Sequence, residues 1–184
     1  AGDSDGLYLN SGASGSEIRG LVINRFQGLG INTFSKSIIA GNFFGTNPAG
    51  DIAQSHGKSN VWVSNATGVL IGGSTPANRN LISASKTEGI TIRGNENIVQ
   101  GNYIGTDAAG TAALGNNGHG ILFRAGTLNN KVGGINPGEG NLIANNAESG
   151  IDVTGGTSAT GNALLGNEIF ANGGGGLALD SDST

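Results

Sequence analysis

The chain repeats itself with a period of about 60 residues. Residues 98–110 read IVQGNYIGTDAAG and closely match residues 38–50, which read IIAGNFFGTNPAG. Residues 72–82 and 133–143 form a second pair, since each opens with Gly-Gly and closes with Asn-Leu-Ile. Units that recur at a fixed spacing stack on one another, and each unit contacts only its neighbours. The repeat therefore predicts a stacked array rather than a globular domain built around one central core.

A shorter unit lies within this period: a Gly, an apolar residue, any residue and a second apolar residue. It recurs about every 30 residues in the middle of the chain. The copies begin at Gly6, Gly28, Gly89, Gly120, Gly150 and Gly176, and Asn60 opens the copy between Gly28 and Gly89. Two more short apolar segments follow each copy, the first ending in Gly and the second usually starting with Asn.

Three short segments of β-branched and aliphatic residues, bounded by Gly or Asn, are typical of three strands joined by turns. Strands this short are stable only when equivalent strands stack at ~4.8 Å and share a core. The pattern predicts an all-β fold, a right-handed single-stranded parallel β-helix of about six three-strand coils. We expect one such domain over residues 1–184, as a segment of a longer repeat protein. The 60-residue period would then arise from long loops that alternate between corners on successive coils.

Composition excludes several classes of partner. Gly accounts for 36 of the 184 residues, but it sits at fixed offsets from apolar pairs, which argues against disorder. Charged residues make up only 12%, with a net charge of -4, so no basic surface for nucleic acid is expected. The absence of Cys excludes disulfides and Cys-ligated metals. No apolar run approaches the ~18 residues that membrane insertion requires.

Three stretches, residues 97–116, 132–144 and 161–172, resemble the pectin-lyase-like β-helix repeats of large secreted and surface bacterial proteins. The resemblance extends over nearly the whole chain. It implies the β-helix fold and a secreted or cell-surface location. That family contains polysaccharide lyases, hydrolases and epimerases as well as non-catalytic stalks and adhesins, so the resemblance does not assign chemistry.

One asparagine opens the third segment of most coils, at the same corner. Stacked side-chain amides are known to stabilise parallel strands, so we interpret this set as a structural ladder rather than as a sugar-binding site. The set consists of Asn42, Asn80, Asn102, Asn141 and Asn167.

A short motif, Gly118-His119-Gly120, matches one found in polygalacturonase-like hydrolases. Such enzymes need two or three carboxylates that converge on the scissile bond. The companion motifs, an Asn-Thr-Asp and an Asp-Asp pair, are missing. We therefore interpret His119 as an ordinary turn residue.

Strand alternation points the middle residue of each Gly-apolar-x-apolar unit away from the core. These middle residues on four successive coils are Trp62, Thr91, Leu122 and Asp152, and Arg93 and Arg124 follow two of the units. We predict that they face solvent and form a glycan-binding or partner-binding surface. They are too few to make a convincing catalytic site.

Two long loops, residues 45–57 and 105–118, carry Asp51 and Asp107. They should leave the same corner two coils apart and project side by side, ~10 Å from each other. Loops on a rigid scaffold often carry binding residues. We therefore add both aspartates to the candidate partner surface, while simple tolerance of inserted turns remains the alternative.

The two ends of the chain are acidic. Calcium favours such oxygen ligands but needs more of them than either end supplies, so we expect no cofactor, with calcium as the one metal to consider. The acidic residues are Asp3, Asp5, Asp180 and Asp182.

Taken together, these patterns favour a non-catalytic structural or adhesin-type module that contacts polysaccharide or a cell-surface glycan. End-to-end association with another copy is also expected, since terminal coils expose strand edges. The alternative hypothesis is a polysaccharide-active lyase, hydrolase or epimerase of the same fold.

Overall fold

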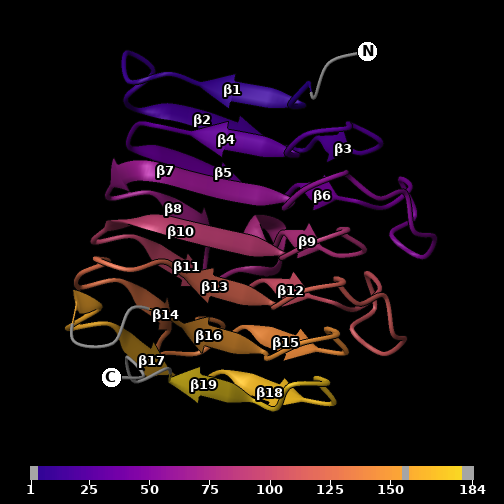
Figure 1. Ribbon diagram of the computed structural model, residues 1–184. Helices are drawn as coiled ribbons and strands as arrows, with labels where there is room; N and C mark the ends of the chain where they lie inside the picture. Colours follow the sequence, from indigo (N-terminus) through magenta and orange to yellow (C-terminus); the bar gives the residue numbers. More distant parts are fainter. Residues whose placement is uncertain (1–3, 155–157, 180–184) are drawn as a thin grey trace.

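The strands of the protein stack in a single column that runs from the N-terminal to the C-terminal coil (Figure 1). The computed structural model describes residues 4–154 and 158–179. Three sheets, here called A, B and C, contain the strands, and every pairing between neighbouring strands is parallel. Each coil adds one strand to each sheet in the order A, B, C.

The strand bounds follow from this order. Sheet A contains β1 (Leu7–Leu9), β4 (Ile31–Thr33), β7 (Val61–Thr67), β10 (Ile90–Asn95), β13 (Ile121–Phe123), β16 (Ile151–Val153) and β19 (Leu177–Leu179). Sheet B contains β2 (Ser16–Arg19), β5 (Ser37–Ala40), β8 (Leu70–Gly72), β11 (Ile98–Gln100), β14 (Lys131–Gly133) and β17 (Ala163–Leu165). Sheet C contains β3 (Val22–Ile23), β6 (Phe43–Phe44), β9 (Leu81–Ile82), β12 (Tyr103–Ile104), β15 (Leu142–Ala144) and β18 (Glu168–Phe170). A short 3-10 helix, η1 (Pro76–Asn78), lies between β8 and β9.

This arrangement confirms the predicted parallel β-helix. Strands β1 to β18 make six coils, and β19 opens a seventh strand position in sheet A. The described residues include no helix long and apolar enough to cross a membrane.

The core is a set of apolar columns that run along the stack. In sheet A the first residue of each strand points inward, and in-register pairing places these residues directly over one another. Ile31, Val61, Ile90, Ile121 and Ile151 are each 0% exposed. Full burial of such a side chain contributes ~1.5–3 kcal/mol, so the stacked columns supply most of the force that holds coil on coil.

Long connections alternate between two corners, which explains the 60-residue period as predicted. After β6 and β12 the chain makes long loops before it returns to sheet A, and both protrude at the right-hand edge of Figure 1. After β8 and β14 the long connection instead lies between sheets B and C.

Glycine at the exit of β12 shows how closely the coils stack. Gly105 has φ +86, and a Cβ placed on it would lie 2.0 Å from the carbonyl oxygen of Ala144 in the next coil. Only a residue without a side chain fits this turn. The recurrence of Gly at the same offset, as at Gly45 after β6, is therefore a packing requirement.

Candidate functional site on the outer face of sheet A

The middle residues of the sheet A strands form one continuous column. Strand pairing places Trp62 beside Thr91, Thr91 beside Leu122, and Leu122 beside Asp152. The predicted solvent exposure is wrong for three of the four: Thr91 is 0%, Leu122 4% and Asp152 6% exposed. The column lies on the outer face of the sheet, but most of it is covered.

A second column of residues covers the first. Its members lie three positions before the middle residue of each strand: Ser59, Glu88, His119 and Ser149. The backbone stacks them coil on coil, because the carbonyl of each accepts a hydrogen bond from the preceding coil, as when Gly89 N donates to His119 O at 2.9 Å. Their side chains reach down to the sheet, and the hydroxyls of Ser59 and Thr91 lie 3.1 Å apart.

His119 meets two carboxylates in this second column. Its Nε2 lies 2.7 Å from Glu148 Oε2 and 3.2 Å from Asp152 Oδ2. With both carboxylates against Nε2, that nitrogen carries the proton and donates it. Nδ1 is buried and has no hydrogen-bond partner among the described residues. The sequence interpretation of His119 as an ordinary turn residue missed this cluster.

Glu88 occupies the equivalent position one coil earlier. Burial by itself raises the pKa of this carboxyl, but hydrogen bonds from its own backbone N–H and from the hydroxyls of Ser59 and Thr87 lower it, as does the charge of Arg124. The net effect is a pKa below the ordinary 4.5. Glu88 is therefore a fixed negative charge that faces Arg124 on the outer surface.

An open hollow of about 300 Å³ lies beside the covered part of the column and is lined by Trp62, Arg93, Arg124 and Ala125. We call it the Trp62 groove. The Arg124 guanidinium carbon lies 5.7 Å from the centre of the Trp62 ring, within cation–π range. The backbone N of Arg124 donates to Ile92 O, which places the two arginines on adjacent coils. The structure thus gathers three of the six predicted surface residues at one point.

Asp152 belongs to the same sheet face but to the His119 cluster, whereas Asp51 and Asp107 lie elsewhere. Asp51 accepts a hydrogen bond from Asn47 Nδ2 at 2.8 Å. Asp107 accepts the backbone N–H groups of Ala112 and Thr111, which lower its pKa below the ordinary 3.8. Both carboxylates order their own loops, and neither lines the Trp62 groove.

The two loops touch each other directly, so the predicted 10 Å separation is wrong. Ala108 N donates to Gly50 O at 2.9 Å. Each loop folds back over the outer face of sheet C: a Cβ on Gly50 would lie 2.9 Å from Leu81, which is why Leu81 is only 2% exposed. By covering β9, the first loop reaches the second across the intervening coil.

The acidic termini are described only in part. Asp5 Oδ1 accepts the backbone N–H of Leu29 at 2.8 Å, which ties the first coil to the second. Asp3, Asp180 and Asp182 lie outside the described residues. Across residues 4–154 and 158–179, no group of three or more His, Asp or Glu side chains is placed to hold a metal ion.

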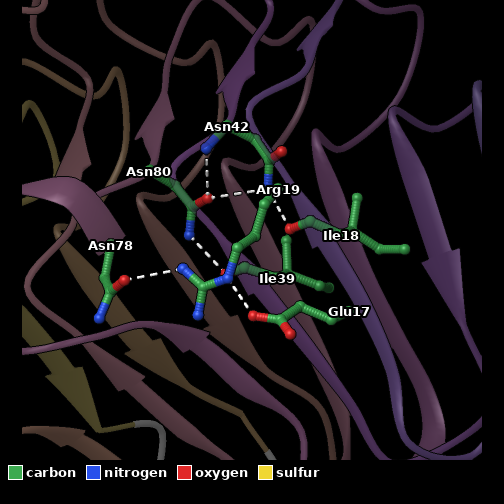
Figure 2. Close-up of polar contacts among 7 residues, drawn as sticks. All are labelled: Glu17, Ile18, Arg19, Ile39, Asn42, Asn78 and Asn80. Atoms are coloured by element: carbon green, nitrogen blue, oxygen red, sulfur yellow. Dashed lines mark hydrogen bonds and ion pairs between the residues drawn. The ribbon is translucent and has the colours of Figure 1, made fainter.

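The asparagines grouped from the sequence form one hydrogen-bonded column between sheets B and C. Figure 2 shows its first step, in which the backbone N and Nδ2 of Asn42 both donate to Asn80 Oδ1, at 3.0 and 3.2 Å. Asn80 Nδ2 also donates to the carbonyl of Ile39 at 2.8 Å. Beside this step, the Arg19 side chain bonds Glu17 and the Asn78 side chain. The same paired bonds then link, in order, Asn80, Asn102, Asn141 and Asn167.

The other two corners of the coil carry columns of their own, which the sequence reading missed. One, between sheets C and A, contains Asn60, Asn116, Asn146 and Asn172. The other, between sheets A and B, contains Asn97, Asn130 and Asn162. In all three columns each donor lies in an earlier coil and the Oδ1 acceptor in a later one. These side chains are occupied by the fold and are not available to a ligand.

The largest hollow on the surface lies away from all of these groups, against sheet C. It has a volume of about 620 Å³, and Tyr103, Ile135, Leu142 and Glu168 are among its lining residues. The Arg79 guanidinium stacks 4.0 Å from the centre of the Tyr103 ring. With one carboxylate and no cation in its lining, it offers less directed chemistry than sheet A.

No family model, no curated protein and no solved structure matches this chain.

Proposed function

We propose that the chain is a rigid, non-catalytic β-helix module, of the pectin-lyase-like kind, that binds an acidic polysaccharide at the Trp62 groove. We further propose that it serves a secreted or cell-surface protein. The observation that carries the proposal is the convergence of one exposed aromatic ring and two guanidinium groups on one hollow.

The chemistry of these side chains suits an acidic sugar. An indole face is a flat apolar surface on which a sugar ring can lie, and guanidinium groups form paired hydrogen bonds with carboxylate or sulfate. The chain as a whole carries a net charge of -4, so a general attraction for polyanions does not account for such binding. Two arginines on adjacent coils provide the local positive charge.

Binding to polygalacturonate, measured by isothermal titration calorimetry, tests the proposal. We expect Trp62→Ala and Arg124→Gln each to weaken binding about tenfold or more, since each removes a principal contact. Arg25→Gln is the matched control, because Arg25 is exposed outside the groove and the net charge changes equally. Absence of binding, or equal loss in all three variants, would overturn the proposal.

A polysaccharide hydrolase or lyase is the second candidate, and the His119 cluster is the observation in its favour. An imidazole held between two carboxylates can take up and deliver protons, and two carboxyl groups are the usual equipment of glycoside hydrolysis. The test is incubation with uronate-containing polysaccharides, with and without calcium, followed by assays for reducing ends and unsaturated products. Reproducible turnover that disappears in His119→Gln and Asp152→Asn would replace the non-catalytic proposal.

A further inference from the structure

A second hollow continues from the Trp62 groove around the corner between sheets A and B. It has a volume of about 250 Å³, and we call it the corner pocket. Arg93 and Ala125 line both hollows, so the two form one continuous depression. The residues that line the corner pocket are Asn65, Arg93, Gly94, Asn95, Ala125, Gly126 and Thr127.

The pocket exists because the corner is longer in this coil. Residues 125–129 connect Arg124 to the ladder residue Asn130, where the coil above needs only residues 94–96 between Arg93 and Asn97. The extra chain bulges outward. The space between this bulge and the coil above is the pocket.

The lining of the pocket consists mainly of hydrogen-bond donors. Arg93 supplies a guanidinium group, and the lining includes no carboxylate. Asn95 Oδ1 already accepts the backbone N–H of Leu128 at 2.8 Å, which leaves its Nδ2 as the free end of the amide. Asn65 is exposed and adds a second amide. A small, polar hollow with one cation and several donors suits an oxygen-rich anion.

Thr127 provides an independent indication of a ligand. The residue is 1% exposed, and its Oγ1 is buried with no hydrogen-bond partner among the described residues. A buried hydroxyl without a partner is unfavourable and rare in native structures. Because Thr127 lines the pocket, an acceptor placed there is the nearest source of the missing bond.

The fold itself does not need this hydroxyl. The carbonyls of Ala66, Gly94 and Thr127 each accept a hydrogen bond from the ladder asparagine of the coil below, so the three residues hold the same corner position in successive coils. Two of the three coils form this corner with no polar side chain at all. The hydroxyl of Thr127 is therefore an addition specific to the coil that forms the pocket.

We propose that the corner pocket binds an oxyanion substituent, a sulfate ester or a carboxylate, of the polysaccharide whose ring lies on Trp62. This inference rests on the function proposed above and names the part of the ligand that enters. The Arg93 guanidinium pairs with the anion, and the Thr127 hydroxyl and the amides of Asn65 and Asn95 donate to its other oxygens. Arg124 and Trp62 hold the adjoining sugar in the groove.

Three polymers with the same backbone test the inference: dextran, carboxymethyl dextran and dextran sulfate. The affinity of each is measured with the parent protein and with Thr127→Val, Thr127→Ser and Arg93→Gln. We expect the parent to prefer an anionic dextran, and we expect Thr127→Val and Arg93→Gln each to weaken that binding about tenfold. Thr127→Ser, which keeps a hydroxyl, should retain the parent affinity. The preferred anionic polymer identifies the substituent as sulfate or carboxylate.

Thermal unfolding provides a readout that a purely structural role of Thr127 would not produce. Thr127→Val removes a buried hydroxyl that has no partner, so the variant should melt at or above the temperature of the parent while it binds less. A lower melting temperature together with unchanged binding would assign the hydroxyl to the fold and refute the inference.

The results also separate this inference from the proposed function. If no anionic dextran binds the parent, the proposed function fails and the inference fails with it. If Trp62→Ala and Arg124→Gln weaken binding but Thr127→Val and Arg93→Gln do not, the groove binds the polymer and the corner pocket is refuted. Competition by sodium sulfate at the concentration of polymer-linked sulfate would show a site for a free ion, and it would contradict binding of a linked substituent.

Discussion

Replacement of Asn116 by Ala should destabilise the whole stack. The Asn116 side chain is 1% exposed and lies in the asparagine column between sheets C and A. Its Nδ2 donates to the carbonyl of Ile82 at 3.2 Å and to Asn146 Oδ1 at 2.8 Å. Its Oδ1 accepts from Ser85 N at 3.0 Å and from Asn60 Nδ2 at 3.2 Å. Alanine removes all four bonds and leaves their partners buried.

The magnitude follows from these four bonds. A hydrogen bond within a protein contributes a net ~1 kcal/mol, and a buried partner left without its bond costs ~1–3 kcal/mol. Some of the stranded groups keep a second partner, since Asn60 Nδ2 also donates to Ser83 O at 2.9 Å. We therefore expect Asn116→Ala to lower the free energy of unfolding by ~3–5 kcal/mol. Because domains of this size are typically stable by ~5–15 kcal/mol, the loss is large.

Urea unfolding measures this difference. Far-ultraviolet circular dichroism reports on all sheets, and Trp62, the single tryptophan, reports on the coil that contains β7. Asn117→Ala is the control, because Asn117 is adjacent and exposed, and the contact described for it is a backbone bond from its N to Ser85 O. This control should stay within ~0.5 kcal/mol of the parent, as surface substitutions usually do.

Equal stability of the two alanine variants would refute the reasoning. It would mean that the amide columns follow from the stacking of the apolar core and add little to it. A loss of cooperativity in Asn116→Ala, with the Trp62 signal separating from circular dichroism, would support it, since stacked repeats unfold in segments when one interface is weakened.

Three further predictions concern titration and packing. Burial lowers the pKa of His56 below the ordinary 6.5, and the neutral ring both donates from Nε2 to Ile23 O and accepts at Nδ1 from Phe26 N. The unfolded chain then binds the proton more readily, so stability should fall as the pH drops below about 6.5, and urea midpoints of His56→Gln should lack this part of the decline. The lowered pKa of Glu88 means that its stabilisation is complete above about pH 4.5 and is lost at lower pH, so Glu88→Gln should show a shallower loss in acid. Gly50→Ala should melt lower than Gly15→Ala, because both have positive φ but only Gly50 would place its Cβ 2.6 Å from the Cβ of Ala108; equal melting temperatures would contradict the contact between the loops.

The coil could be predicted from the sequence because its determinants are local and recur. Alternation around Ile90 and Ile92 sets which side chains point inward, and Gly105 marks a turn that only glycine fits. The column that contains Asn102 could be predicted for the same reason, since an asparagine opens the same segment in successive coils. A pattern that repeats every coil reports on stacking, which is an interaction between equivalent residues.

The covered face of sheet A could not be predicted, because strand alternation gives the direction of a side chain and not what lies over it. Thr91 points away from the core as expected, yet the turn before the strand places Ser59 on top of it. A signal was present in the constant offset of three positions between the two columns, which joins His119 to the face that carries Asp152. The contact between the two loops depends instead on how Gly50 folds back over sheet C, and the coil spacing alone carries no information about that.

Between neighbouring asparagines, every hydrogen bond runs the same way, from the backbone N and Nδ2 of one coil to the Oδ1 of the next. The stack is therefore vectorial, and the two faces of any coil are chemically unequal. One face presents N–H groups and the other presents amide oxygens, so a coil laid on in reverse would set donors against donors. A molecule that extends such a stack through its asparagine columns has to approach head to tail. That geometry builds an open filament and is incompatible with a closed twofold pair.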